Sequence, residues 1–152
     1  MPIKDTLNRY AALKDDLERC GIVSLREVEI RRRQGDGGAL GERTDIYVTG
    51  YSLSSQKIIR VIIEAKGCWH DKLETAMTDQ LVNRYLKDND CQHGIYLIGW
   101  FKCNQWDTKD SRYNKSSSLS LEEARNTFNK QAKALSADGK NIKAVILNCG
   151  LR

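Results

Sequence analysis

The sequence predicts an α/β fold: a single domain with a mixed central sheet flanked by helices. Segments with apolar residues three and four positions apart, typical of amphipathic helices, alternate along the chain with short apolar or alternating segments, typical of strands. The 152 residues suffice for one core and are too few for two. A content of 40% hydrophobic and 30% charged residues describes a folded chain. We therefore expect one domain over residues 1–152.

The first half of the chain predicts one helix and three strands. Residues 5–20 carry apolar side chains at helical spacing. Residues 24–32 alternate imperfectly, as a half-buried strand does, and a glycine-rich loop follows at 34–41. Residues 44–51 alternate cleanly, and residues 57–65 form an apolar, β-branched segment of the kind that a central strand requires.

The second half predicts two helices and two strands. Residues 71–87 follow a helical stripe, residues 94–101 form a hydrophobic strand, and residues 102–118 read as a polar loop. Ser120 and Glu123 have the spacing of a capping box and predict the start of the last helix, which Gly139 closes.

A last buried strand is expected at residues 142–148. The predicted order is thus an α-β-β-β-α-β core with an added C-terminal helix and strand.

Composition narrows the classes of protein. A net charge of +5 and a pI near 9.0 favour a polyanionic partner such as nucleic acid. The five cysteines show no C-x-x-C spacing and predict neither a disulfide framework nor a zinc ribbon. No apolar segment is long enough to cross a bilayer, so we expect a cytoplasmic protein without membrane contact.

The chemistry is expected at the end of the strand over residues 57–65. Glu64 and Lys66 interrupt its apolar pattern, and a charge inside a sheet costs several kcal/mol unless it is paired or bound to a metal. Because strand side chains alternate, both residues point to one face. A symmetric hairpin that turns at Ser54 and Ser55 places Asp45 directly opposite Glu64.

Two carboxylates this close repel each other, and a divalent cation between them removes the repulsion. Mg²⁺, which Mn²⁺ commonly replaces, prefers oxygen ligands and keeps waters, one of which attacks a phosphate. Lys66 would hold that water or offset the charge of the phosphate. The plainer interpretation is an ion-pair cluster at a strand end, in which Lys66 only neutralises Glu64.

The arrangement of Asp45 and Glu64-Ala65-Lys66 on adjacent strands resembles the PD-(D/E)XK, or restriction-endonuclease-like, nuclease superfamily. The resemblance covers most of the chain and includes the order of elements. It implies that Asp45, Glu64 and the Ala65 carbonyl bind metal, and that Lys66 is the catalytic lysine. Thr44 precedes Asp45 where the family motif has proline.

On the following helix, Gln80 and Arg84 are expected within the apolar stripe. Branches of the family carry a glutamine and a tyrosine four residues apart here, so the resemblance extends to Gln80 as a catalytic residue. Tyr85 lies one residue too far along. Glu18, at the end of the first expected helix, resembles loosely an extra metal-binding acid of some members.

Several basic residues are candidates for nucleic-acid contact, although runs of this kind are usually solvated surface. They combine with aromatic rings in the loop over 102–118, which suits base stacking. These candidates are Arg31, Arg32, Arg33, His70, Arg84, Lys109, Arg112 and Lys115. A zinc site formed by the pairs Cys68/His70 and Cys91/His93 is a weaker alternative, because C-x-H is not the usual zinc spacing.

We therefore expect a Mg²⁺-dependent deoxyribonuclease with little intrinsic sequence specificity. The family suggests an effector domain of a bacterial defence protein, as a homodimer or attached to a larger multidomain protein. The residues do not distinguish DNA from RNA. A rival is a catalytically inactive nucleic-acid-binding module of the same fold, and a third interpretation is a domain in which the charged cluster only orders a strand end.

Overall fold

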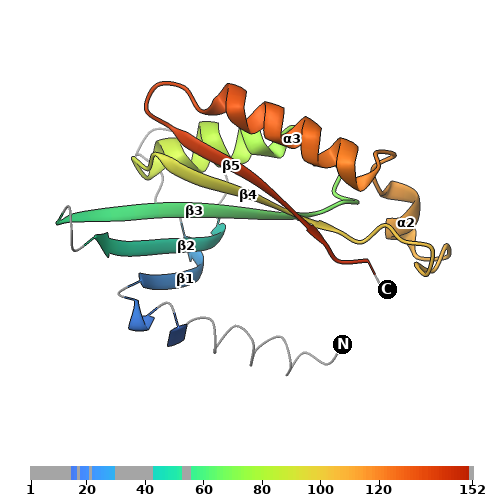
Figure 1. Cartoon of the computed structure of the whole chain (residues 1–152), viewed down its shortest axis with the longest axis horizontal. Helices are drawn as coiled ribbons and strands as arrows, with labels where there is room; N and C mark the ends of the chain where they lie inside the picture. Colours follow the sequence, from blue (N-terminus) through green and yellow to red (C-terminus); the bar gives the residue numbers. More distant parts are fainter. Residues whose placement is uncertain (1–14, 17, 21, 30–42, 53–55, 151–152) are drawn as a thin grey trace.

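The protein is built on one five-stranded sheet with the strand order β1-β2-β3-β4-β5 (Figure 1). The computed structural model describes the chain except residues 1–14, 17, 21, 30–42, 53–55 and 151–152, and at residues 23–29, 43–45 and 52 it describes the backbone alone. The strands are β1 (Ile22–Glu29), β2 (Arg43–Ser52), β3 (Lys57–Gly67), β4 (His93–Trp100) and β5 (Asn141–Asn148).

The sheet is mixed, as the sequence predicts. β1, β2 and β3 pair antiparallel, whereas β3, β4 and β5 pair parallel. Parallel neighbours need crossover connections. The helix η1 (Met77–Leu86) lies between β3 and β4, and α3 (Leu121–Leu135) lies between β4 and β5. The α/β fold class is therefore confirmed.

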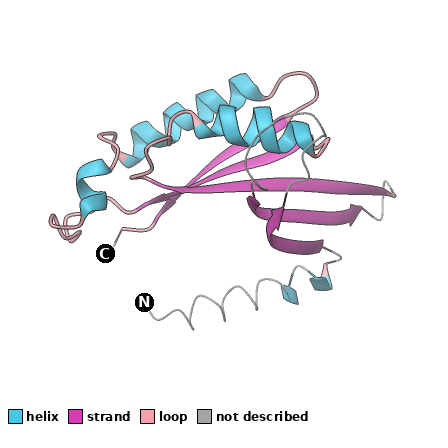
Figure 2. Cartoon of the chain, turned by 180° about the vertical axis from the view of Figure 1, so that it is seen from behind, coloured by secondary structure: helices cyan, strands magenta, loops and turns pink. Residues whose placement is uncertain are grey.

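Both crossover helices lie on one face of the sheet, as the two opposite views show (Figures 1 and 2). Alternate residues of the parallel strands turn toward them and are buried. Tyr96 of β4 contacts the ring of Phe128 on α3, and Gly94 lies against Leu81 and Leu86 of η1. The strand positions in between form the second face, which the two crossover helices leave uncovered.

Helix α3 begins as its sequence predicts. The Ser120 side chain accepts a hydrogen bond from the Glu123 backbone N–H, and the Glu123 carboxylate accepts one from the Ser120 N–H. Two of the N–H groups that a helix start leaves without partners are thereby satisfied. The chain then turns through Gly139, whose φ of +80° suits glycine, into β5.

Two expectations need correction. The segment over 102–118 is not an unbroken loop, because the short helix α2 (Ser111–Lys115) forms there after Asp110, which caps it. The helix expected from residue 71 starts later, after a series of turns, and winds as a π-helix.

Some expectations fall largely outside the described residues. Of the first expected helix, Asp15, Asp16, Glu18 and Arg19 are helical, and most of the remainder lies outside. The glycine-rich loop, the three arginines before it and the turn of the hairpin also lie outside. Within the described part of the chain, no helix is long and apolar enough to cross a membrane.

Candidate functional site

The β2–β3 hairpin has the predicted register. Its pairs run from Ser52 opposite Lys57 to Ile46 opposite Ile63. Continued by one residue, this register sets the backbone of Asp45 across from Glu64. Directly opposed strand residues have Cβ atoms about 5 Å apart and share a face. The strands thus hold these two acidic positions side by side at one end of the hairpin.

Glu64 is the buried charged residue of the described core, with 2% of its surface exposed. The Lys66 Nζ donates a hydrogen bond to Glu64 Oε1, and this ion pair is close. The Lys66 side chain is 12% exposed. A buried carboxylate is tolerated only when a partner charge or hydrogen bonds compensate its lost hydration. Lys66 supplies that charge from the same face of β3.

Tyr96 is a neighbour of Glu64 that the sequence did not single out. The two residues are register partners on the parallel strands β3 and β4, and Tyr96 is fully buried. Burial, and second the Glu64 charge, raise the pKa of Tyr96 well above its usual value. Its hydroxyl donates to the Leu73 carbonyl at 2.8 Å. Tyr96 therefore covers Glu64 with a neutral ring and fixes the segment that leads into η1.

Helix η1 contacts both β3 and β4 and presents Gln80. The Gln80 Oε1 is buried without a hydrogen-bond partner in the described structure. Such an atom calls for a ligand, water or ion. Arg84 was expected in the apolar stripe beside Gln80, and this is wrong: Arg84 is exposed.

The π-helical winding changes which residue follows Gln80 on its face. Hydrogen bonds from residue i to i+5 widen the turn, so Tyr85 lies closer to the face of Gln80 than it would in an α-helix. Tyr85 is buried, in keeping with this position. The extra residue between Gln80 and Tyr85, which an α-helix would place on different faces, is absorbed by the wider turn. Sequence periodicity assumes α-geometry and therefore missed it.

The metal-donor set in the described part is incomplete. No group of three or more His, Cys, Asp or Glu side chains gathers among the residues that the structure describes. The side chain of Asp45 is not among them. Glu64 contributes a hard carboxylate oxygen, which suits Mg²⁺, and Gln80 contributes a buried amide oxygen on the adjacent helix. By their chemistry, both oxygens suit a hard cation.

An open pocket of about 440 Å³ lies just beyond the end of β3. His70, Lys115 and Ser117 are among its lining residues, together with Asp71 and Glu74. The Ser117 N–H donates to the Cys68 carbonyl at 2.9 Å, which fastens the segment after α2 to the end of β3. Two predicted nucleic-acid contacts, His70 and Lys115, are thus brought into one pocket.

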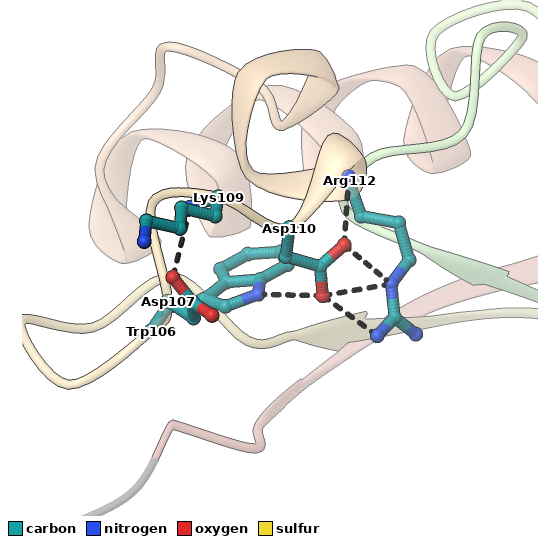
Figure 3. A network of polar contacts seen from close by, with 5 residues as sticks. All are labelled: Trp106, Asp107, Lys109, Asp110 and Arg112. Atoms are coloured by element: carbon teal, nitrogen blue, oxygen red, sulfur yellow. Dashed lines mark hydrogen bonds and ion pairs between the residues drawn. The ribbon is translucent and has the colours of Figure 1, made fainter.

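A polar network holds the loop before α2 (Figure 3). The Arg112 guanidinium donates to both oxygens of Asp110, and Trp106 Nε1 donates to Asp110 at 3.2 Å. The hydrogen bonds from Arg112 and Trp106 hold the pKa of Asp110 well below its usual range. Arg112 is thus tied to a carboxylate, whereas Lys109 is exposed.

The weaker zinc hypothesis is wrong as far as the described residues show. Cys68 hydrogen-bonds to Gly99 at one end of the β3–β4 pair, whereas His93 pairs with Val61 near the other end. The Cys91 thiol donates to the Arg60 carbonyl, and burial raises its pKa, which disfavours the thiolate that zinc needs.

Two groups of predicted site residues are not joined to the site by the described structure. Glu18 is exposed on its short helical piece. Arg31, Arg32 and Arg33 lie outside the described residues.

Comparison of the chain with protein-family models, with curated proteins and with solved structures gives no match.

Proposed function

We propose that this protein is a metal-dependent nuclease that hydrolyses phosphodiester bonds in DNA. The observation that carries the proposal is the buried Glu64 carboxylate paired with Lys66 at the end of a central strand, one residue beyond the Ile46–Ile63 pair of the hairpin, whose register extends to Asp45. Burying charge is costly, and proteins concentrate such costs at sites of chemistry. The same residues carry the resemblance to the PD-(D/E)XK nucleases.

In this proposal Asp45 and Glu64 hold Mg²⁺ or Mn²⁺, with the Ala65 carbonyl and Glu18 as further candidates. The cation would supply charge that stabilises the phosphate and lowers the pKa of a water. Lys66, released from Glu64 by the competing cation, would donate a hydrogen bond to the attacking water or to a phosphate oxygen. Gln80 would orient the water or the cation from η1, and Tyr96 excludes bulk water from behind Glu64.

The test is cleavage of supercoiled plasmid in Mg²⁺, in Mn²⁺ and in EDTA. We expect nicking that EDTA abolishes and that Lys66→Ala reduces by at least about 100-fold, in line with removal of one transition-state donor. Lys57→Ala is the matched control, because Lys57 lies on the same strand, is exposed, and starts its opposite end. If the Lys66 variant nicks at the wild-type rate, the mechanism is wrong.

Glu64→Gln separates metal binding from folding. Glutamine keeps the volume of the buried side chain and removes the charge that attracts the cation. We expect lost cleavage in a variant that still unfolds cooperatively. Titration of Mn²⁺ by calorimetry should show weaker binding than in wild type. Unchanged Mn²⁺ affinity would remove Glu64 from the proposed ligand set.

The second candidate function is a nucleic-acid-binding module without catalysis. It is favoured by the closed Glu64–Lys66 pair, in which the lysine already compensates the carboxylate. Binding to DNA that is equal with and without EDTA, together with no nicking in Mn²⁺, would establish it in place of the nuclease.

A further inference from the structure

Two glycines on neighbouring strands leave room for aromatic rings at the end of the sheet. Gly67 of β3 and Gly99 of β4 are register partners. A Cβ built on Gly67 would lie 2.6 Å from the Trp69 ring, and one built on Gly99 would lie 2.6 Å from the Phe101 ring. Each strand therefore carries a glycine at or next to its end, over which an aromatic ring two residues later folds back.

The two rings lie on the face that the crossover helices leave uncovered. Strand alternation puts Gly67 on the opposite face from Lys66, and Gly99 on the opposite face from buried Ile98. Leu147 of β5 is the register partner of Gly99 and shares this face. Phe101 is 38% and Leu147 is 48% exposed. We name Trp69, Phe101 and Leu147 the aromatic shelf.

Residues next to and within α2 contact Trp69 of the aromatic shelf. The ring centroids of Trp69 and Phe101 are 5.1 Å apart, and those of Trp69 and Trp106 are 5.9 Å apart. The Arg112 guanidinium lies 5.2 Å from the Trp69 ring, fixed there by Asp110. These contacts immobilise Trp69 while the Phe101 ring keeps an exposed part. Such preorganisation lowers the entropic cost of binding a flat ligand.

The segment 101–118, which reaches the aromatic shelf through Phe101, Trp106 and Arg112, carries positive charge. The segment 101–118 contains four basic residues against two acidic ones. One acid, Asp110, is compensated by Arg112, and the other, Asp107, accepts a hydrogen bond from the backbone of Lys109. The side chains of Lys109 and Lys115 are exposed. Exposed rings among cations are the means by which proteins bind single strands, since every base has a face that stacks and every phosphate is an anion.

We propose that the aromatic shelf is a stacking platform for unpaired bases of single-stranded nucleic acid, with Lys109 and Lys115 contacting phosphates. It rests on the proposed function only in taking nucleic acid as the ligand. If the platform serves the proposed nuclease, the substrate contains a single-stranded segment. The platform lies on the opposite face of the same strand end from Lys66, so it holds bases away from the proposed cleavage site.

The test measures binding in EDTA, so that it is independent of cleavage. Fluorescence anisotropy compares labelled oligo(dT), oligo(U) and a DNA duplex of equal length. We expect both single strands to bind at least about tenfold more tightly than the duplex, with the difference between oligo(dT) and oligo(U) identifying the preferred sugar. Quenching of tryptophan emission should accompany binding, because Trp69 belongs to the aromatic shelf and Trp106 contacts it, whereas Trp100 is buried.

Phe101→Leu should weaken single-strand binding about tenfold and leave duplex binding unchanged, because a base stacks on the ring and not on an aliphatic side chain. Tyr51→Leu is the matched control: Tyr51 is 51% exposed, near the far end of the hairpin, and its loss should change nothing. Leu147→Gln, an exposed substitution that spares the ring packing, should also weaken single-strand binding.

The proposal is overturned if the Phe101 and Leu147 variants bind oligo(dT) as tightly as wild type does. It is also overturned if the wild-type protein binds the duplex more tightly than the single strands. Self-association that Phe101→Leu abolishes, without single-strand binding, would show instead a surface for a second copy. Neither result bears on the plasmid-nicking assay with the Lys66 variant. Failure of the stacking-platform proposal and failure of the nuclease proposal are therefore distinguishable.

Discussion

At the scale of residues, the site depends on charge held where water is scarce. The Glu64 carboxylate is buried beside Lys66 and against Tyr96, whose pKa is raised by burial and by the Glu64 charge. The effect on Tyr96 has a thermodynamic consequence. A group with a raised pKa in the folded state binds its proton more tightly there than in the unfolded chain, so unfolding becomes easier once the unfolded group loses its proton.

The first prediction concerns stability at alkaline pH. The contribution of Tyr96 is fully present below its unfolded pKa of about 10 and is lost as pH rises from there toward its higher folded pKa. Tyr96→Phe cannot ionise, so its free energy of unfolding should fall less steeply above pH 10 than that of wild type. Urea unfolding at a series of pH values measures both slopes, and parallel curves would contradict the assignment.

The second prediction concerns the facing glycines. A methyl group on Gly99 displaces the Phe101 ring, and overpacking of this kind costs about 1–3 kcal/mol. Gly99→Ala should therefore lower the free energy of unfolding by that amount. Gly50→Ala is the control, because its Cβ would meet Ile22 at an ordinary 3.4 Å. Urea titration of the two variants gives the comparison, and equal stability would show that Phe101 moves aside freely.

At the scale of elements, a helix start that depends on neighbouring residues was predicted correctly, whereas one that depends on contacts with the sheet was not. The capping box starts α3 where Ser120 and Glu123 predicted, because both partners lie within one turn. The late start and π-winding of η1 have no local signal. Tyr96 holds the Leu73 carbonyl, and Leu81 and Leu86 lie against Gly94, so the sheet constrains the helix at both ends.

The third prediction tests the capping box. Ser120→Ala leaves the Glu123 N–H without its side-chain acceptor and should cost about 1 kcal/mol in the free energy of unfolding. The Ser120 backbone N–H, and second the Ser120 side chain, hold the pKa of Glu123 below its usual value; alanine removes only the side-chain contribution, so this pKa should rise part of the way in the variant. Carboxyl titration by NMR checks the shift. Ser118→Ala is the control, because Ser118 is exposed and lies outside the helix; it should change neither the free energy of unfolding nor the pKa of Glu123.

At the scale of the whole molecule, an excess of five positive charges defines the expected partner. The structure divides the basic residues of the α2 region by role. Lys109 is exposed and Lys115 lines the pocket beyond β3, whereas Arg112 is tied to Asp110 and Trp69. The lysines are placed for phosphate contact, and the arginine for holding the loop.

The fourth prediction follows from this division. The affinity for duplex DNA should fall as salt rises, and Lys115→Ala should reduce the slope of log K against log salt by about one, uniformly across sequences. Arg112→Ala should instead lower thermal stability and disturb tryptophan fluorescence, because it frees Asp110 and Trp69. If Arg112→Ala changes the salt slope alone, its role is phosphate contact.

The sequence by itself determined the elements whose signal is local. Alternation identified the first two strands and continuous apolar segments the other three, the capping box placed the last helix, and the interruption of an apolar strand singled out Glu64 and Lys66. The hairpin register, which continued by one residue sets Asp45 opposite Glu64, was also predictable, because a short antiparallel connection allows few alignments.

Only the tertiary structure decided what depends on contacts between distant segments. Parallel pairing of β3 with β4 placed Tyr96 beside Glu64 and joined Gly67 to Gly99 beneath the aromatic shelf. In the π-wound helix η1, Arg84 is exposed and Tyr85 is buried. The physical reason is that periodicity specifies which faces of an element are apolar, whereas packing against other elements selects the register and winding that bring particular side chains together.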